Sequence, residues 1–215
     1  MGQNSTSTIN TVADIVRVHG VGLASKDAVI QGDRVLSWGR LYERSRRLAN
    51  ALSAAGVKPI DRVSFLDKNS IEHFEVFFGC SLLNAVAVDV NWRLAAPEVA
   101  YIVNDAESRV FIVHNDFRPI LDAIAADLRP DSVVVIIGGD ASPVGNLRTI
   151  AYEDFVASGG DADPNVPAGS DDVAFQLYSS GTTGRPKGVM LTNNNFFALM
   201  PLATEMWELD ADAMN

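Results

Sequence analysis

The sequence predicts a doubly wound α/β fold, with largely parallel sheets and flanking helices. Short apolar segments alternate along the chain with longer segments in which apolar residues recur at helical spacing. Two of the short segments, residues 110–113 and 133–137, are entirely apolar, which is typical of parallel strands covered on both faces. With 215 residues, 47% of them hydrophobic, the chain can bury a core without a disulfide or a metal.

The predicted helices follow from apolar periodicity and from end signals. Apolar residues at positions 41, 48, 49, 52 and 55 share one helical face, and Gly56 closes that helix. Pro97 stands where the first turn of a helix tolerates proline. A further helix has a stripe made of Ile71, Phe74, Phe77, Phe78 and Leu82. The remaining helices are predicted over 10–17, 117–128 and 152–156, and after an Asn cap within 193–195.

The predicted strands fill the gaps between these helices. Residues 28–30 and 35–38 form a pair around a turn at 31–33. The other strands are predicted at 62–66, 85–90, 110–113, 133–137, 173–178 and 189–191.

Four parts are expected along the chain. Residues 1–9 are small and polar and form a flexible N-terminus, and residues 10–158 form an α/β subdomain. Residues 159–172 are acidic and rich in Gly and Pro, so we interpret them as a linker. Residues 173–215 hold a strand, a loop, a second strand and the start of the next helix.

Composition excludes several functions and suggests a compartment. The net charge of −10 argues against a nucleic-acid partner, because such a surface repels phosphates. No run of eighteen apolar residues and no signal peptide is found, so we expect a cytoplasmic protein without a transmembrane segment. The lone Cys80 is interpreted as core packing in a reducing compartment. The three histidines, His19, His73 and His114, lack the spacing of metal ligands.

One stretch, YSSGTTGRPKGVMLT at residues 178–192, carries most of the functional signal. Between residues 173 and 204 the only charged side chains are Arg185 and Lys187, so this segment carries +2 while the rest of the chain carries −12. Glycines allow the backbone to approach a ligand, consecutive N–H groups bind anions, and hydroxyls donate to phosphate oxygens or coordinate Mg²⁺. The predicted ligand-binding residues are Ser179, Ser180, Gly181, Thr182, Thr183, Gly184, Lys187 and Gly188.

Two other interpretations of the stretch were weighed. A solvent-exposed turn without a ligand is the ordinary explanation of a Gly/Ser/Thr loop, but this loop is longer than a tight hairpin needs and has no acidic neighbours. A Walker motif requires Lys directly after Gly and a helix next, whereas here Pro186 precedes the Lys and a strand follows. The residues themselves therefore favour a phosphate-binding loop between two strands.

The stretch resembles the signature loop of the AMP-forming acyl-CoA synthetases, a superfamily that also holds adenylation domains and firefly luciferase. Residues 37–63 are similar to the family's first helix and strand, and residues 83–105 to its next block. Two positions depart from the pattern. Asn84 stands where members often have Gly, and Asn193 where many have His, a change that mildly favours the fatty-acid branch.

The resemblance implies that the chain is part of the large N-terminal domain of a two-step ligase. A carboxylic acid, expected to be a fatty acid, would react with ATP to give acyl-AMP and pyrophosphate, and coenzyme A would then displace AMP. Lys187 and the hydroxyls of Ser180, Thr182 and Thr183 would contact the departing pyrophosphate, and Mg²⁺ is expected with the ATP. No catalytic residue is assigned in this chain, which we expect to be inactive alone.

Several alternatives stay open. The nearest alternatives are a fatty acyl-AMP ligase and an amino-acid adenylation domain. In these, the acceptor of the activated acyl group is not coenzyme A. A nucleotide-binding or interaction module without catalytic activity is a third. The acyl chain length, the metal ligands and the oligomeric state cannot be predicted from these residues, and a homodimer is one possibility.

Overall fold

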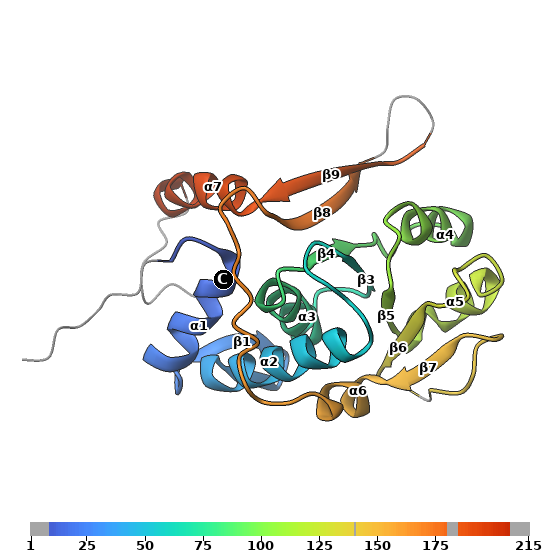
Figure 1. Cartoon of the computed structure of the whole chain (residues 1–215), viewed down its shortest axis with the longest axis horizontal. Coiled ribbons are helices and arrows are strands. Elements are labelled where there is room, and N and C mark those ends of the chain that lie inside the picture. Colours follow the sequence, from blue (N-terminus) through green and yellow to red (C-terminus); the bar gives the residue numbers. More distant parts are fainter. Residues whose placement is uncertain (1–8, 140, 180–184, 207–215) are drawn as a thin grey trace, which may run out of the picture.

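A computed structural model describes residues 9–139, 141–179 and 185–206 of the chain. Seven strands form one sheet in the order β7-β6-β5-β3-β4-β8-β9, and β1 and β2 form a separate antiparallel pair. All neighbouring pairs in the large sheet are parallel except β8 and β9, which are antiparallel. The predicted α/β fold with a largely parallel sheet is confirmed (Figure 1).

The helices and strands have the following bounds. The strands are β1 Asp27–Gln31, β2 Arg34–Ser37, β3 Arg62–Leu66, β4 Val86–Asp89, β5 Val110–His114, β6 Val133–Ile137, β7 Arg148–Ala151, β8 Val173–Ser179 and β9 Lys187–Thr192. The α-helices are α1 Val12–Gly22, α2 Trp38–Ala54, α3 Ile71–Leu82, α4 Ala96–Asp105, α5 Arg118–Ile124, α6 Tyr152–Ser158 and α7 Asn193–Met206, with a 3₁₀ turn at Asn115–Phe117.

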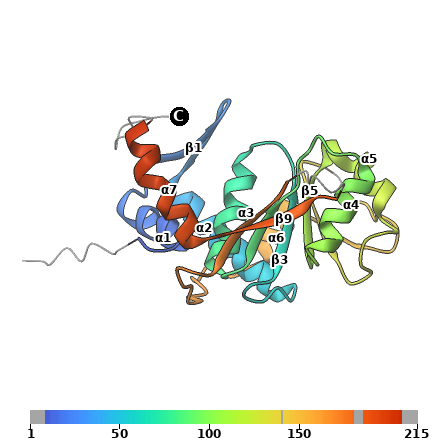
Figure 2. The ribbon, with the colours of Figure 1, turned by 90° about the horizontal axis from the view of Figure 1, so that it is seen from above.

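Helices cover both faces of the sheet, which explains the apolar strands. Successive residues of β5 alternate between two cores: Val110 and Ile112 belong to the core that contains residues of α1, α2, α3 and α6, while Phe111 and Val113 belong to the core that contains residues of α4 and α5. Figures 1 and 2 show these two groups of helices on opposite sides of the sheet. The prediction of a sheet covered on both faces is confirmed.

Hydroxyl side chains cap the first three helices. The hydroxyl of Thr11 accepts a hydrogen bond from the Asp14 backbone N–H at 3.4 Å, and the Asp14 carboxylate accepts from the Thr11 N–H at 2.9 Å. The hydroxyls of Ser37 and Ser70 cap α2 and α3 by accepting from the backbone N–H groups of Arg40 and His73, without the reciprocal bond. Helix α1 therefore begins at Val12, two residues later than predicted, and Trp38 begins α2 where a strand end was predicted.

The predicted stripe on α3 is wrong at one position. Phe74 is 44% exposed, whereas Glu72 and Glu75 are buried. The reason is electrostatic, because two arginines from neighbouring elements pair with these carboxylates, Arg34 with Glu72 at 2.6 Å and Arg44 with Glu75 at 2.5 Å. Acidic side chains occupy core-facing positions of α3 since their charges are matched.

Residues 159–172 carry no helix or strand, and hydrogen bonds attach them to the first two helices. Asp163 accepts hydrogen bonds from Arg17 of α1 at 2.8 Å and from the Tyr42 hydroxyl of α2 at 2.7 Å. Asn50 of α2 donates to the carbonyl groups of Gly160 and Ala162. The segment predicted as a linker thus lies along α1 and α2, and β8 after it joins the same sheet as β3–β7.

Candidate functional site

The hairpin of β8 and β9 carries the predicted phosphate-binding residues that the structure describes. Tyr178 pairs with Gly188 and Ser179 with Lys187 in the last two rungs of the antiparallel ladder. Ser179, Lys187 and Gly188 are all exposed to solvent. The other predicted residues, Ser180, Gly181, Thr182, Thr183 and Gly184, lie outside the described residues.

The hairpin end projects past the rest of the sheet. The ladder between β4 and β8 ends where Asp89 pairs with Leu177. After Leu177, the next two residues of β8, Tyr178 and Ser179, pair only with β9 among the residues that the structure describes. The hydroxyl of Ser179 and the ammonium group of Lys187 are therefore presented on adjacent arms at the carboxyl end of β8.

Gly188 has a packing role that the sequence did not reveal. A Cβ atom at this position would lie 2.5 Å from Nε2 of Gln176 and 3.4 Å from Cζ of Tyr178, both on the opposite strand. The Gln176 amide in turn donates to the Tyr178 hydroxyl at 3.1 Å. Glycine at 188 leaves room for this pair of side chains, which is a different reason from the backbone freedom predicted for it.

Helix α4 contacts both arms of the hairpin, a relationship that sequence reasoning missed. Tyr178 donates a hydrogen bond from its hydroxyl to Oδ2 of Asp105 at 2.7 Å. The Tyr101 hydroxyl lies 3.3 Å from both the Pro186 carbonyl oxygen and Oδ1 of Asp105. Burial and then the hydrogen bond to Asp105 raise the pKa of Tyr178 above its usual value, so its hydroxyl stays a donor at neutral pH.

The two cations of the stretch differ in their surroundings. The guanidinium of Arg185 lies 5.7 Å from the centre of the Tyr101 ring, at the distance of a cation–π contact. Lys187 is exposed at the start of β9. An anion approaching the hairpin end therefore meets a lysine available from the solvent side.

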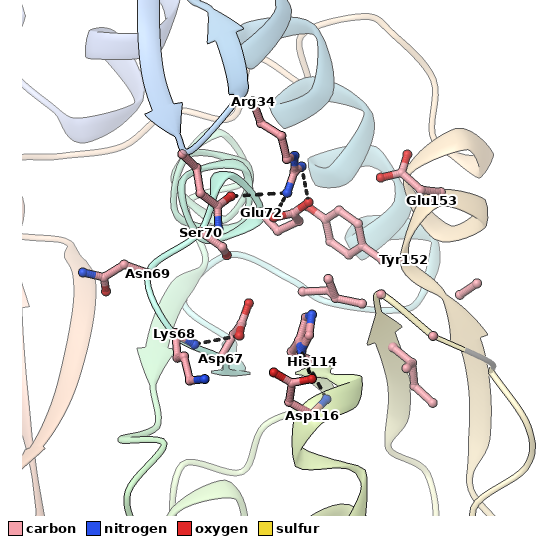
Figure 3. A pocket seen from close by; sticks show the side chains of 16 residues that line it. Arg34, Asp67, Lys68, Asn69, Ser70, Glu72, His114, Asp116, Tyr152 and Glu153 are labelled. Atoms are coloured by element: carbon pink, nitrogen blue, oxygen red, sulfur yellow. Dashed lines mark hydrogen bonds and ion pairs between the residues drawn. The ribbon is translucent and has the colours of Figure 1, made fainter.

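A crevice of about 540 Å³ lies at the carboxyl ends of β3, β5 and β6 (Figure 3). After β3 the chain passes to α3 on one face of the sheet, and after β5 to α5 on the other face. Such a switch point is where open α/β sheets commonly bind ligands. The crevice is lined by residues that include Asp67, Lys68, Asn69, Ser70, His114, Asp116, Gly138 and Gly139.

Two of the carboxylates that line this crevice form ion pairs with arginines. Arg34 pairs with Glu72 at 2.6 Å, and Glu153 pairs with Arg44 at 2.7 Å (Figure 3 shows the first pair). The His114 ring accepts a hydrogen bond from the Asp116 backbone N–H at 3.1 Å. The pairing leaves no single class of ligand favoured at this position.

A second, apolar groove of about 350 Å³ lies between α3, the hairpin and α7. It is lined by His73, Phe74, Phe77, Asp89, Phe175, Leu191 and Phe196. His73 hydrogen-bonds Asp89 through Nε2 at 3.0 Å at its edge. The exposed Phe74 of the predicted α3 stripe thus belongs to a surface groove, not to the core.

The described part of the chain has no preassembled metal-ligand cluster, and its cysteine is buried. No group of three His, Cys, Asp or Glu side chains is placed there to hold a metal ion. Cys80 is fully buried, and burial raises the pKa of its thiol well above the usual value, so its packing interpretation agrees with the structure. Within the described ranges, no helix is both long and apolar enough to cross a bilayer.

Fold and site together define an α/β domain with a largely parallel sheet, whose hairpin presents Lys187 and the Ser179 hydroxyl at the carboxyl end of β8. Residues 19–214 match the AMP-binding enzyme family, and the chain belongs to this family.

Relatives and solved structures agree with this assignment. The chain is 35% identical over 192 residues to the fatty acid–[acyl-carrier-protein] ligase ScoC of Streptomyces coeruleorubidus, covering 89% of the chain and 34% of the relative. It is 38% identical over 169 residues to a 3-hydroxybenzoate–CoA ligase of Aromatoleum sp. (strain CIB), covering 79% of the chain and 31% of the relative. The structure matches that of the anthranilate CoA ligase AuaEII in complex with anthranoyl-AMP, with a TM-score of 0.80 and 30% identity over 92% of the chain and 36% of that protein.

The chain spans about a third of the length of these relatives. It corresponds to the N-terminal region of the adenylate-forming enzymes. The resemblance seen in the signature stretch is therefore confirmed at the level of the family.

Proposed function

We propose that this chain is the N-terminal part of an AMP-forming ligase that activates a carboxylic acid as acyl-AMP and transfers the acyl group to coenzyme A. The observation that carries the proposal is the hairpin end, where Ser179 and Lys187 face each other at the base of the signature stretch. The family match over residues 19–214 supports it.

The proposed role of the hairpin is to bind the leaving pyrophosphate. Attack of the carboxylate on the α-phosphate breaks the bond to the bridging oxygen, and negative charge builds on the β and γ phosphates. Lys187 and the hydroxyl groups of the stretch would stabilise that charge, because cations and oriented donors act most strongly where charge develops. The contacts of Ser180, Thr182 and Thr183 with phosphate or Mg²⁺ stay predictions, as do the roles of Gly181, Gly184 and Gly188.

The proposed substrate is a fatty acid, and an aromatic acid is the second candidate. The relatives support both, since one is named for a fatty acid and the other for hydroxybenzoate. They also differ in the acceptor, which is a carrier protein in the first and coenzyme A in the second. The side chain of Asn193, the position thought to favour the fatty-acid branch, bonds the Val12 N–H and the Gly169 carbonyl at 2.9 Å each, so it has a structural function here.

Pyrophosphate exchange tests the proposal. The protein encoded by the complete gene should catalyse exchange of labelled pyrophosphate into ATP when given its acid, in a panel of fatty acids, benzoate and hydroxybenzoates. Replacement Lys187→Ala should lower the rate by about 100-fold, the typical effect of removing one group that stabilises transition-state charge. Exchange with no acid in the panel, or full exchange in the Lys187→Ala variant, would contradict the proposal.

Two further measurements separate the alternatives. Exchange that is not followed by thioester formation with coenzyme A would indicate an acyl-AMP ligase or an adenylation domain. Nucleotide binding without exchange for any acid would indicate a module that binds without catalysis. The 215-residue chain alone is expected to form no thioester.

A further inference from the structure

Two side chains of α4 contact the hairpin end from outside the signature stretch. Tyr101 and Asp105 are four residues apart in the helix, so both lie on the same helical face. Asp105 reaches the β8 arm through the Tyr178 hydroxyl, and Tyr101 reaches the β9 side through the Pro186 carbonyl oxygen. Figures 1 and 2 both place α4 beside the end of the β8–β9 hairpin.

The hairpin end needs such support because the sheet does not extend to it. The β4–β8 ladder stops at Leu177, and a two-stranded hairpin alone is only marginally stable in water. The hydrogen bond from Tyr178 to Asp105, at 2.7 Å, joins an uncharged donor to a charged acceptor. Bonds to charged groups are stronger than neutral ones.

The Tyr101 hydroxyl has one hydrogen and two acceptors at 3.3 Å, Oδ1 of Asp105 and the Pro186 carbonyl. It can donate to one of them at a time. When it donates to Pro186, it attaches the chain directly before Lys187 to α4, and the Arg185 guanidinium lies over its ring. Both arms of the hairpin are then held by one helix face.

We propose that Tyr101 and Asp105 are positioning residues that hold the hairpin end against α4 and thereby fix Lys187 for its contact with the pyrophosphate of ATP. This inference rests on the function proposed above for the hairpin. Neither residue touches the substrate in this account, and each acts through the backbone and side chains of the two arms.

The test compares variants of the protein encoded by the complete gene. Tyr178→Phe and Asp105→Ala each remove the bond between α4 and β8, and each should lower kcat/KM for ATP by about tenfold while KM for the acid changes less than about twofold. Asp105→Asn keeps an acceptor oxygen, so its kcat/KM for ATP should fall less than that of Asp105→Ala. The combined variant should be no worse than Asp105→Ala, because that change already removes the bond from Tyr178 together with the Oδ1 acceptor beside Tyr101.

A matched control comes from elsewhere in the same chain. Tyr42→Phe removes another tyrosine–aspartate bond of 2.7 Å, between α2 and Asp163. It should lower stability without changing the kinetic constants for ATP. Hydrogen exchange gives a readout independent of catalysis, since residues 185–192 should exchange faster in Tyr178→Phe and should be unchanged in Tyr42→Phe.

The outcomes separate this inference from the proposed function. If Lys187→Ala abolishes pyrophosphate exchange while Tyr178→Phe and Asp105→Ala behave like Tyr42→Phe, the positioning role is overturned and the proposed function stands. If Lys187→Ala leaves exchange unchanged, the function proposed for the hairpin is overturned and the positioning role with it.

Discussion

Tyr42 of α2 donates a hydrogen bond of 2.7 Å from its hydroxyl to Asp163, which lies 121 residues further along the chain. Arg17 of α1 binds the same carboxylate through two nitrogens, at 2.8 and 3.0 Å. One carboxylate thus joins two helices to the segment that leads into β8. The stability of this junction should depend on the protonation states of Tyr42 and Asp163.

The junction should weaken at alkaline pH. Burial, followed by the hydrogen bond to Asp163, raises the pKa of Tyr42 from 10.0 to about 12. Because the folded state holds this proton more tightly than the unfolded state, the contribution to stability is complete below pH 10 and is lost as the pH rises towards 12. Urea unfolding across this range should show a decline that Tyr42→Phe reduces. An identical decline in the variant would contradict the assignment.

Asn84 should tolerate glycine better than alanine. Its backbone is in the left-handed region, with φ of 54°, and its side chain donates to Oδ2 of Asp172 at 2.9 Å. Asn84→Gly loses the side-chain bonds to Asp172 and to the Pro167 carbonyl but relieves the left-handed backbone, and we expect a cost of about 1 kcal/mol. Asn84→Ala loses the same side-chain bonds and keeps a Cβ in the left-handed region without the polar group that lets Asn adopt it, so about 1–2 kcal/mol more should be lost than with glycine. Denaturant unfolding of the two variants measures this order, and equal stability would refute it.

Removing one member of the buried Arg44–Glu75 pair should destabilise the protein more than replacing both members with apolar side chains. Glu75 is 1% exposed, and the Tyr152 hydroxyl donates to it at 2.8 Å as well. Arg44→Met leaves this carboxylate without its cation, and we expect a loss of about 3 kcal/mol. Adding Glu75→Leu to Arg44→Met should recover part of that loss, because it removes the unpaired charge but leaves the buried Tyr152 hydroxyl without its acceptor. A double variant less stable than Arg44→Met would show that the carboxylate has another stabilising role.

Gly188→Ala should disturb the hairpin through Gln176. The new Cβ would lie 2.5 Å from Nε2 of Gln176, which is the end of a flexible side chain, so the amide can move away. We expect a cost of about 1 kcal/mol, the value of the hydrogen bond to Tyr178 that is lost. Thermal unfolding measures it, and the matched experiment repeats Gly188→Ala in a Gln176→Ala background. There the added cost should be close to zero, and an unchanged cost would point to backbone strain instead.

Much of the fold could be predicted from residue order because the signals were local. Residues 62–66 and 133–137 were predicted as strands and form β3 and β6 with those bounds, since short apolar segments between polar turns leave few alternatives. Strand β7 was missed because Arg148–Ala151 is a partly exposed edge strand without an apolar pattern. Helix α5 ends at Ile124, four residues earlier than predicted.

The candidate site likewise has one part with a local sequence signal and one part without it. Phosphate binding is predicted from the hydroxyls, glycines and lysine of residues 178–192, because nearly all of those groups lie within one short stretch, and it stays a prediction. The residues of α4 that contact this stretch could not be predicted from the sequence. Asp105 precedes Tyr178 by 73 residues, and no periodicity in either segment marks the other.

The physical reason for this difference is how far along the chain each interaction acts. Backbone preference, apolar spacing and helix capping act within a few residues, so the order of residues alone was enough for the layered α/β architecture and for the family signature. Ion pairs such as Arg44–Glu75 and the support of Tyr178 by α4 join elements that meet only after the sheet has assembled. These contacts between distant residues pair the two buried glutamates of α3 with arginines and join Tyr178 of β8 to Asp105 of α4.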